Sequence, residues 1–125
     1  MEFEVFDKRV AISPSEPVVG IQKGGVFTLN RAAFELLGKP VAVELMFNRA
    51  KKVIGFRAAP KVLPHAYSVR PNSAGSTYQV SGSAFARYYG ISTEKGRRWR
   101  AELVGKILTV DTTQPSLQDR YAMRS

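Results

Sequence analysis

Residues 27–38 read Phe-Thr-Leu-Asn-Arg-Ala-Ala-Phe-Glu-Leu-Leu-Gly, and residues 78–90 read Tyr-Gln-Val-Ser-Gly-Ser-Ala-Phe-Ala-Arg-Tyr-Tyr-Gly. Both stretches open with alternating apolar residues, which is typical of a half-buried strand. Asn30 and Ser81 then offer side-chain oxygens that can cap a helix N-terminus. Gly38 and Gly90 suit the left-handed residue that follows a helix. Each stretch is therefore predicted to be a strand, a helix of about two turns and a glycine stop.

The two helices are expected to turn a narrow apolar side toward the core. Aligning Ala33 with Ala84 places the extra residue of the second copy just before Gly90. The inward positions then follow an i, i+1, i+4 spacing. They are Ala33, Phe34 and Leu37 in the first helix, and Ala84, Phe85 and Tyr88 in the second.

Strands are predicted on both sides of each helix. Alternating apolar residues and polar turns indicate hairpins over 41–57 and 99–110, and weaker strand pairs precede the helices over 17–29 and 66–81. Each half then has the order ββαββ. A short helix and a lone hairpin are both unstable in isolation, so half of the chain cannot bury its apolar faces alone. We expect the two pseudo-repeats to close their strands into one shared β-barrel, in a protein that is mostly β with two short helices.

The rest of the chain divides around these repeats. The first repeat spans 17–59 and the second 66–111, and the linker 60–65 is held extended by two prolines. Residues 1–16 form an N-terminal extension that can supply an extra strand from Met1, Phe3 and Val5. Residues 112–125 are expected to be a flexible C-terminal tail, because they contain a proline and few apolar residues.

Composition excludes several classes of protein. A chain of 125 residues is one domain's worth, and the absence of cysteine excludes disulfide scaffolds, thiolate zinc sites and cysteine nucleophiles. The acidic start does not resemble a secretion signal, and no apolar run is long enough to span a membrane. We expect a cytoplasmic protein without membrane contact.

The charge of the chain points to a polyanionic partner. The net charge is +9, and residues 17–110 alone carry 15 basic and 4 acidic residues. The excess therefore lies in the part that is predicted to fold. A compact basic domain of this kind favours binding to phosphate backbones or to another acidic partner.

The strand–helix–hairpin unit resembles the AbrB/SpoVT/MazE family of swapped-hairpin DNA-binding domains. The resemblance is carried by residues 25–38, 41–47 and 53–57, and again by 77–90 and 98–110. Two tandem units in one chain are similar to the arrangement in the MraZ proteins. Taken with the charge, the resemblance implies a swapped-hairpin barrel that binds duplex DNA and acts as a transcriptional regulator. It also implies that the loop between the first two strands, which holds Lys23 or Arg70, faces DNA together with the helix region.

The densest candidate for phosphate binding is Lys95-Gly-Arg-Arg-Trp-Arg100. In a strand, Trp99 alternating with Ala101 and Leu103 would face the core, which places Arg98 and Arg100 together on the outer surface. Guanidinium groups match phosphate oxygens bidentately. The full set of candidate nucleic-acid-binding residues is Lys23, Arg31, Arg70, Arg87, Lys95, Arg97, Arg98 and Arg100. Lys51 and Lys52 are interpreted instead as part of a solvated turn.

No pattern indicates catalysis, a metal or a cofactor. His65 lies in the linker without a carboxylate or a second ligand nearby in sequence. The protein is therefore predicted not to be an enzyme. One alternative to DNA binding is a protein-interaction module, antitoxin-like or an assembly subunit, whose partner or second copy binds the terminal segments. Another is RNA or single-strand binding, for which an exposed Tyr88 or Tyr89 beside Arg87 would suit base stacking.

Overall fold

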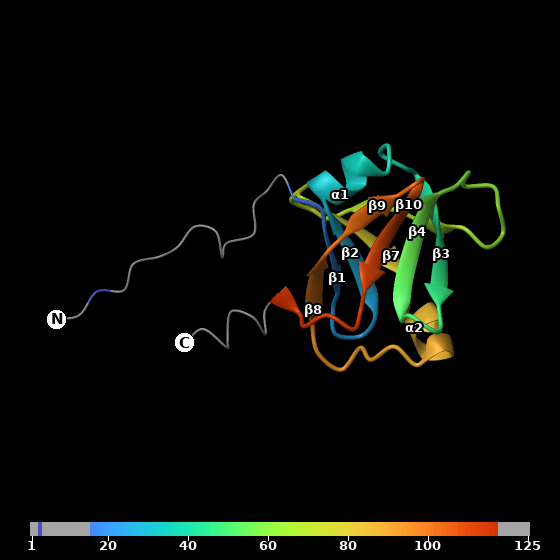
Figure 1. Ribbon diagram of the computed structural model, residues 1–125. Helices are drawn as coiled ribbons and strands as arrows, with labels where there is room; N and C mark the ends of the chain where they lie inside the picture. The colour runs from blue at the N-terminus through green and yellow to red at the C-terminus, as the bar shows by residue number, and fades with distance from the viewer. Residues whose placement is uncertain (1–2, 4–15, 118–125) are drawn as a thin grey trace.

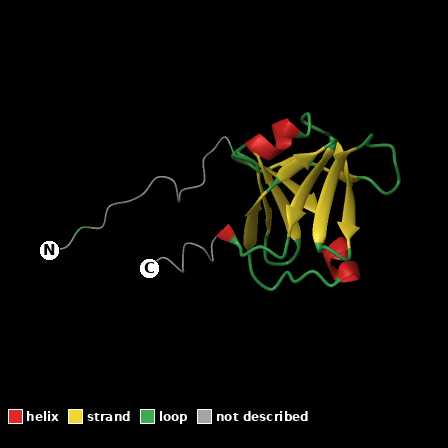
Figure 2. Ribbon diagram, in the orientation of Figure 1, coloured by secondary structure: helices red, strands yellow, loops and turns green. Residues whose placement is uncertain are grey.

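Two antiparallel five-stranded sheets and two short helices make up the protein, as the computed structural model shows (Figures 1 and 2). The structure describes Phe3 and residues 16–117. The extra strand predicted near the N-terminus and the last part of the predicted tail lie outside these residues. Within them, neither helix is long and apolar enough to cross a membrane.

The order of elements follows the predicted repeat. The first half contains β1 (Val18–Ile21), β2 (Val26–Asn30), α1 (Arg31–Leu36), β3 (Ala42–Asn48) and β4 (Val53–Ala58). The second half contains β5 (Tyr67–Ser68), β6 (Arg70–Pro71), β7 (Thr77–Ser81), α2 (Ser83–Tyr89), β8 (Arg97–Arg100), β9 (Glu102–Val104) and β10 (Ile107–Asp111).

Each sheet combines strands from both halves. The first sheet has the order β6-β7-β2-β1-β8, and the second has the order β5-β3-β4-β10-β9. The halves meet where β2 pairs with β7, where β4 pairs with β10, where β1 pairs with β8, and where β3 pairs with β5. The chain passes from one sheet to the other three times: through α1, between β2 and β3; at Val69, between β5 and β6; and at Ala101, between β8 and β9. Neither half therefore has a sheet of its own.

The core lies between the two sheets. Phe27 of β2 is fully buried and meets Phe56 of β4 edge-on at a centroid distance of 6.1 Å, and Phe85 of α2 at 5.8 Å. Its neighbours are aliphatic residues that alternate along the strands, as the period-two pattern predicts. The largest of them are Val19, Ile21, Leu29, Val43, Ile54, Val80, Leu108 and Val110.

The start of α1 confirms the predicted cap. The Asn30 Oδ1 atom accepts from the Ala33 backbone N–H at 2.9 Å and from the Val18 N–H at 3.0 Å. Its Nδ2 group donates to the Glu16 carbonyl at 2.7 Å. Gly38 follows the helix with φ 85°, in the left-handed region that glycine adopts without strain. Asn30 therefore joins the helix start to the entry of β1.

The start of α2 differs from the prediction. Ser81 is the last residue of β7, and the N-cap is Gly82, which has no side chain to cap the helix. The extra residue of the second copy is thus at the strand–helix junction and not before Gly90. A Cβ at Gly82 would lie 3.0 Å from three ring atoms of Phe27, which explains why the inserted residue is a glycine.

This insertion rotates the inward side of α2 by one residue. Phe85 and Ala86 are buried, whereas Ala84 is exposed and Tyr88 is 73% exposed, so the predicted inward positions Ala84 and Tyr88 are wrong. Tyr89 is half-buried and takes the place expected for Tyr88. The first helix buries Ala33 and Leu37 as predicted.

Candidate nucleic-acid interface

Four segments that are distant in sequence meet at the end of the molecule that carries α2 (Figure 1). They are the β1–β2 turn (22–25), the β3–β4 turn (49–52), residues 82–97, and residues 111–117. The Gly24 N–H donates to the Thr93 carbonyl at 3.1 Å, and the Gly82 N–H donates to the Gly25 carbonyl at 3.1 Å. The Thr112 N–H donates to the Lys52 carbonyl, also at 3.1 Å. Backbone hydrogen bonds therefore join the segments in two pairs, and the contact of Arg49 with Tyr88 and Tyr89 links the β3–β4 turn to α2.

Cations dominate this end. The four segments carry seven basic residues, and their only carboxylates are Glu94 and Asp111. Six of the basic side chains are exposed, and we call this set the basic end: Lys23, Arg49, Lys51, Lys52, Arg87 and Lys95. The structure thus brings together three of the predicted residues and adds the whole β3–β4 turn, which sequence interpretation assigned to solvent.

Arg97, the seventh basic residue, supports the fold at this end. Its guanidinium carbon lies 4.9 Å from the centre of the Trp99 ring, and its Nη2 atom donates to the Ser92 carbonyl at 2.8 Å. Trp99 is buried as predicted, and its indole N–H donates to the Gln114 carbonyl at 2.8 Å. Arg97 therefore covers the tryptophan and closes the loop before β8. Ser116 and Leu117 are also buried, so residues 112–117 pack against the sheet although the sequence assigned them to the tail.

Arg98 and Arg100 lie on the outer face of β8, as the alternation predicts. The Arg98 side chain passes over Gly20, where a Cβ would come within 3.2 Å of its Cγ atom. The Arg100 Nε atom is 2.6 Å from a carboxylate oxygen of Glu16, so this guanidinium is already paired. Leu103 is partly exposed, because the chain changes sheets at Ala101 and the inward alternation does not continue.

Arg70 and Arg31 are away from the basic end. Arg70 is on the edge strand β6, and Arg98 is on β8 at the opposite edge of the same sheet. One row of paired residues crosses the sheet between them, formed by Gly20, Thr28 and Gln79. Arg31 begins α1 at the other end of the molecule and donates to the Gly75 carbonyl at 3.2 Å. The eight predicted residues consequently do not form a single face.

An aromatic cluster accompanies the cations of the basic end. Tyr88 stands perpendicular to Tyr89, with ring centres 4.9 Å apart. The guanidinium carbon of Arg49 lies 5.7 Å from the Tyr88 ring centre and 4.8 Å from that of Tyr89. Sequence interpretation did not select Arg49, because only the fold places the β3–β4 turn beside α2. Of the two adjacent tyrosines, Tyr88 is the exposed one.

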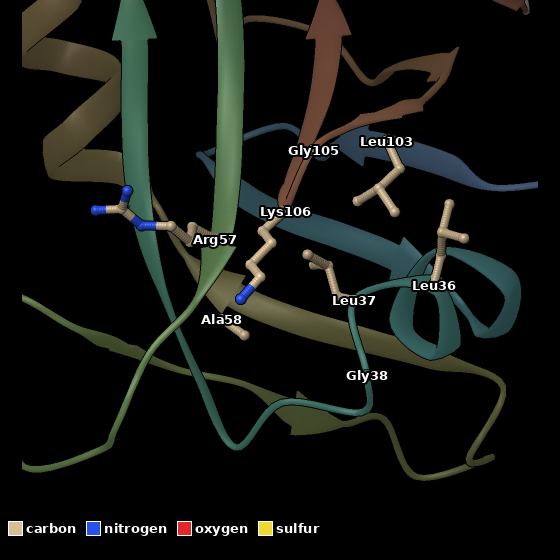
Figure 3. Close-up of a pocket in the computed structure, with 8 residues that line it drawn as sticks. All are labelled: Leu36, Leu37, Gly38, Arg57, Ala58, Leu103, Gly105 and Lys106. Atoms are coloured by element: carbon tan, nitrogen blue, oxygen red, sulfur yellow. The ribbon is translucent and has the colours of Figure 1, made fainter.

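The opposite end carries a small apolar pocket of about 320 Å³ beneath the β9–β10 turn (Figure 3). Leu36, Leu37 and Leu103 surround it, and the Lys106 side chain extends along it toward Ala58. Leu36 and Leu103 are both partly exposed to solvent. The two ends of the molecule therefore differ in chemistry.

One cluster of titratable groups lies on β3, β4 and the linker. The Glu44 carboxylate accepts from the Arg57 Nε–H at 2.9 Å and is 2.6 Å from the His65 Nε2 atom. His65 thus has a carboxylate partner that sequence spacing did not reveal. The hydrogen bonds from Arg57 and then from His65 lower the pKa of Glu44 below its usual 4.5.

This lowered pKa predicts an acid-dependent contribution to stability. The ionised Glu44 carboxylate stabilises the folded protein above its ordinary pKa, and the contribution is lost as pH falls through the lower folded value. Chemical unfolding of Glu44→Gln and of the wild type should therefore differ near neutral pH, and the two midpoints should converge in acid. A gap between the midpoints that stays constant throughout this range would contradict the prediction.

Among residues 16–117, no group of three or more histidine, aspartate or glutamate side chains is placed to hold a metal ion. The basic end is therefore the strongest candidate site, and its chemistry is that of anion binding. Comparison with protein-family models, with curated proteins and with solved structures finds no match for this chain.

Proposed function

We propose that this protein binds duplex DNA through its basic end and acts in the cytoplasm as a regulator of transcription. The observation that carries the proposal is the set of six exposed cations gathered from three separate segments onto one end, where the four segments together contribute only two carboxylates. Phosphate contacts from lysine and arginine supply most of the non-specific affinity for DNA. Turns and a short helix project these side chains beyond the sheets.

Arg98 extends this surface along the outer face of β8. Its exposed guanidinium can reach a phosphate beside the basic end, whereas Glu16 already neutralises Arg100. Arg70 and Arg31 would contact only a DNA that wraps past the sheet edge or reaches the opposite end. We therefore assign the main contacts to the basic end and a flanking contact to Arg98.

We also propose that the two sheets together form a swapped-hairpin barrel of the AbrB/SpoVT/MazE type. Two features support this architecture. In both sheets, two strands of the first half lie between strands of the second half, and the chain continues from one sheet into the other at Val69 and Ala101. A barrel of this kind would make the chain a pseudo-dimer whose α1 and α2 ends occupy equivalent positions.

Titration of the purified chain against random-sequence duplex DNA across a range of salt concentrations tests the function. About five phosphate contacts would give a log–log slope near −4.5, so affinity should fall roughly a thousandfold between about 50 and 300 mM salt. Size-exclusion chromatography in parallel gives the mass of the bound species. No binding at the lowest salt would refute the proposal.

The apolar pocket at the opposite end favours a second candidate, a protein-interaction module. Leu36 and Leu103 expose apolar surface there next to the Lys106 side chain. A partner protein that buries these leucines would be held mainly by apolar contact, which salt does not weaken. A stoichiometric complex that survives high salt, in a chain that does not bind DNA, would establish this function instead.

A further inference from the structure

The side chain of Tyr88 is the feature of the basic end that phosphate binding alone does not explain. Tyr88 lies on α2 and is 73% exposed. The residues before and after it have other roles, since Arg87 is an exposed cation and Tyr89 packs against the core. An aromatic ring that is mostly exposed contributes little to the stability of the core. It offers a flat apolar face to a ligand beside the cations of the basic end.

The ring is also held in place before any ligand arrives. Tyr89 packs against Phe47 and Phe85, with ring centres 5.0 and 4.9 Å apart. Tyr88 stands on Tyr89 at 89°, and Arg49 lies over both tyrosines. The half-buried Tyr89 ring, packed against Phe47 and Phe85, thus sets the orientation of Tyr88, so stacking of a ligand on Tyr88 would cost little side-chain entropy.

Cations of α2 and of the β3–β4 turn, the two segments that meet at the ring, indicate the class of its ligand. Arg49, Lys51 and Lys52 come from the β3–β4 turn, and Arg87 precedes Tyr88 in α2. An exposed aromatic ring framed by cations is the combination with which proteins bind unpaired nucleotides, because the ring stacks on a base while the cations hold the backbone. A duplex keeps its bases stacked inside, and offers such a base only at an end, a gap or a bubble.

We propose that Tyr88 is a stacking platform for an unpaired nucleobase, so that the preferred ligand of the basic end is duplex DNA joined to a single-stranded segment. This inference rests on the proposed function, in which the same cations hold the duplex backbone. Tyr88 adds a contact that depends on the unpaired base and not on phosphate charge.

The test compares a blunt duplex with the same duplex carrying a single-stranded overhang that contains 2-aminopurine. The wild type should bind the overhang substrate roughly 5- to 100-fold more tightly than the blunt one, and stacking should quench the 2-aminopurine fluorescence. Tyr88→Phe keeps the ring and should keep both effects. Tyr88→Leu keeps apolar bulk without a π face and should lose both, while binding to the blunt duplex and the melting temperature stay unchanged.

The outcomes separate the two proposals. If the wild type binds blunt and overhang DNA equally, the stacking platform is refuted and duplex binding stands. If Tyr88→Leu retains the overhang preference and the quenching, the ring is not the platform. If neither DNA binds at low salt, both proposals fail.

Discussion

Changing Lys23, Lys51 and Arg87 together to glutamine should weaken binding to random duplex DNA roughly 100- to 1,000-fold at about 0.1 M salt. Each residue comes from a different segment of the basic end, and each is exposed. One phosphate contact releases about 0.9 counterions, which amounts to about tenfold in affinity at this salt concentration. The salt slope should fall by about three units, measured by the titration that tests the function.

A second triple variant distinguishes the effect of where the charges lie from the effect of net charge on DNA binding. Lys39 follows α1, Lys61 is in the linker and Lys106 is in the β9–β10 turn; all three are exposed and lie outside the segments of the basic end. Changing them to glutamine removes the same number of charges. This control should keep a salt slope close to that of the wild type. Equal losses in the two triple variants would mean that the protein responds to its total charge, and the basic end would no longer be the binding site.

Replacing Phe27 with alanine should lower the free energy of unfolding by about 3–5 kcal/mol, which is the range measured for large aromatic truncations in cores. Phe27 is fully buried, contacts Phe56 and Phe85, and packs against the backbone of Gly82. Phe27 therefore packs against a strand of the other sheet, against α2 and against the junction where α2 begins. In a chain of this size the melting temperature should fall by roughly 10–20 °C.

The same substitution at Phe3 provides the control. Phe3 is 85% exposed, so its truncation should change stability by no more than about 0.5 kcal/mol. Unfolding by denaturant, followed by tryptophan fluorescence, measures both variants because Trp99 lies in the core. A Phe27→Ala variant as stable as Phe3→Ala would show that the packing around Phe27 does not hold the two halves together.

Local patterns were enough to predict most elements of the fold. Alternation located the main strands, and Asn30, Gly38 and Gly90 marked helix ends because caps depend on residues next to them. The position of the inserted residue at Gly82 was not predictable, because its reason is a contact with Phe27, more than fifty residues away. Local alignment instead favoured the Ala-Phe match, which gave the wrong inward side for α2.

The candidate site was predictable only in part, for a similar reason. Charge counting identified a basic domain, and alternation placed Trp99 inward and Arg98 outward on β8. The grouping of Lys23 with the β3–β4 turn depends on strand pairing between the halves, which sequence spacing does not reveal. The pairing of Arg97 with Trp99 and of Arg100 with Glu16 also appears only in three dimensions, and it removes these two arginines from the main surface.

The interleaving of two unequal halves has a consequence for valency. A homodimer built from one repeated half would have to carry identical chemistry at both ends, and could bridge two DNA segments. Here one chain holds both halves, so the two ends are free to differ. The α2 end has tyrosines and the cations of the β3–β4 turn, whereas the α1 end has leucines around a pocket. If the proposed function holds, each molecule binds one DNA segment, in one orientation, through its α2 end. Its α1 end then stays available for an apolar contact with another molecule.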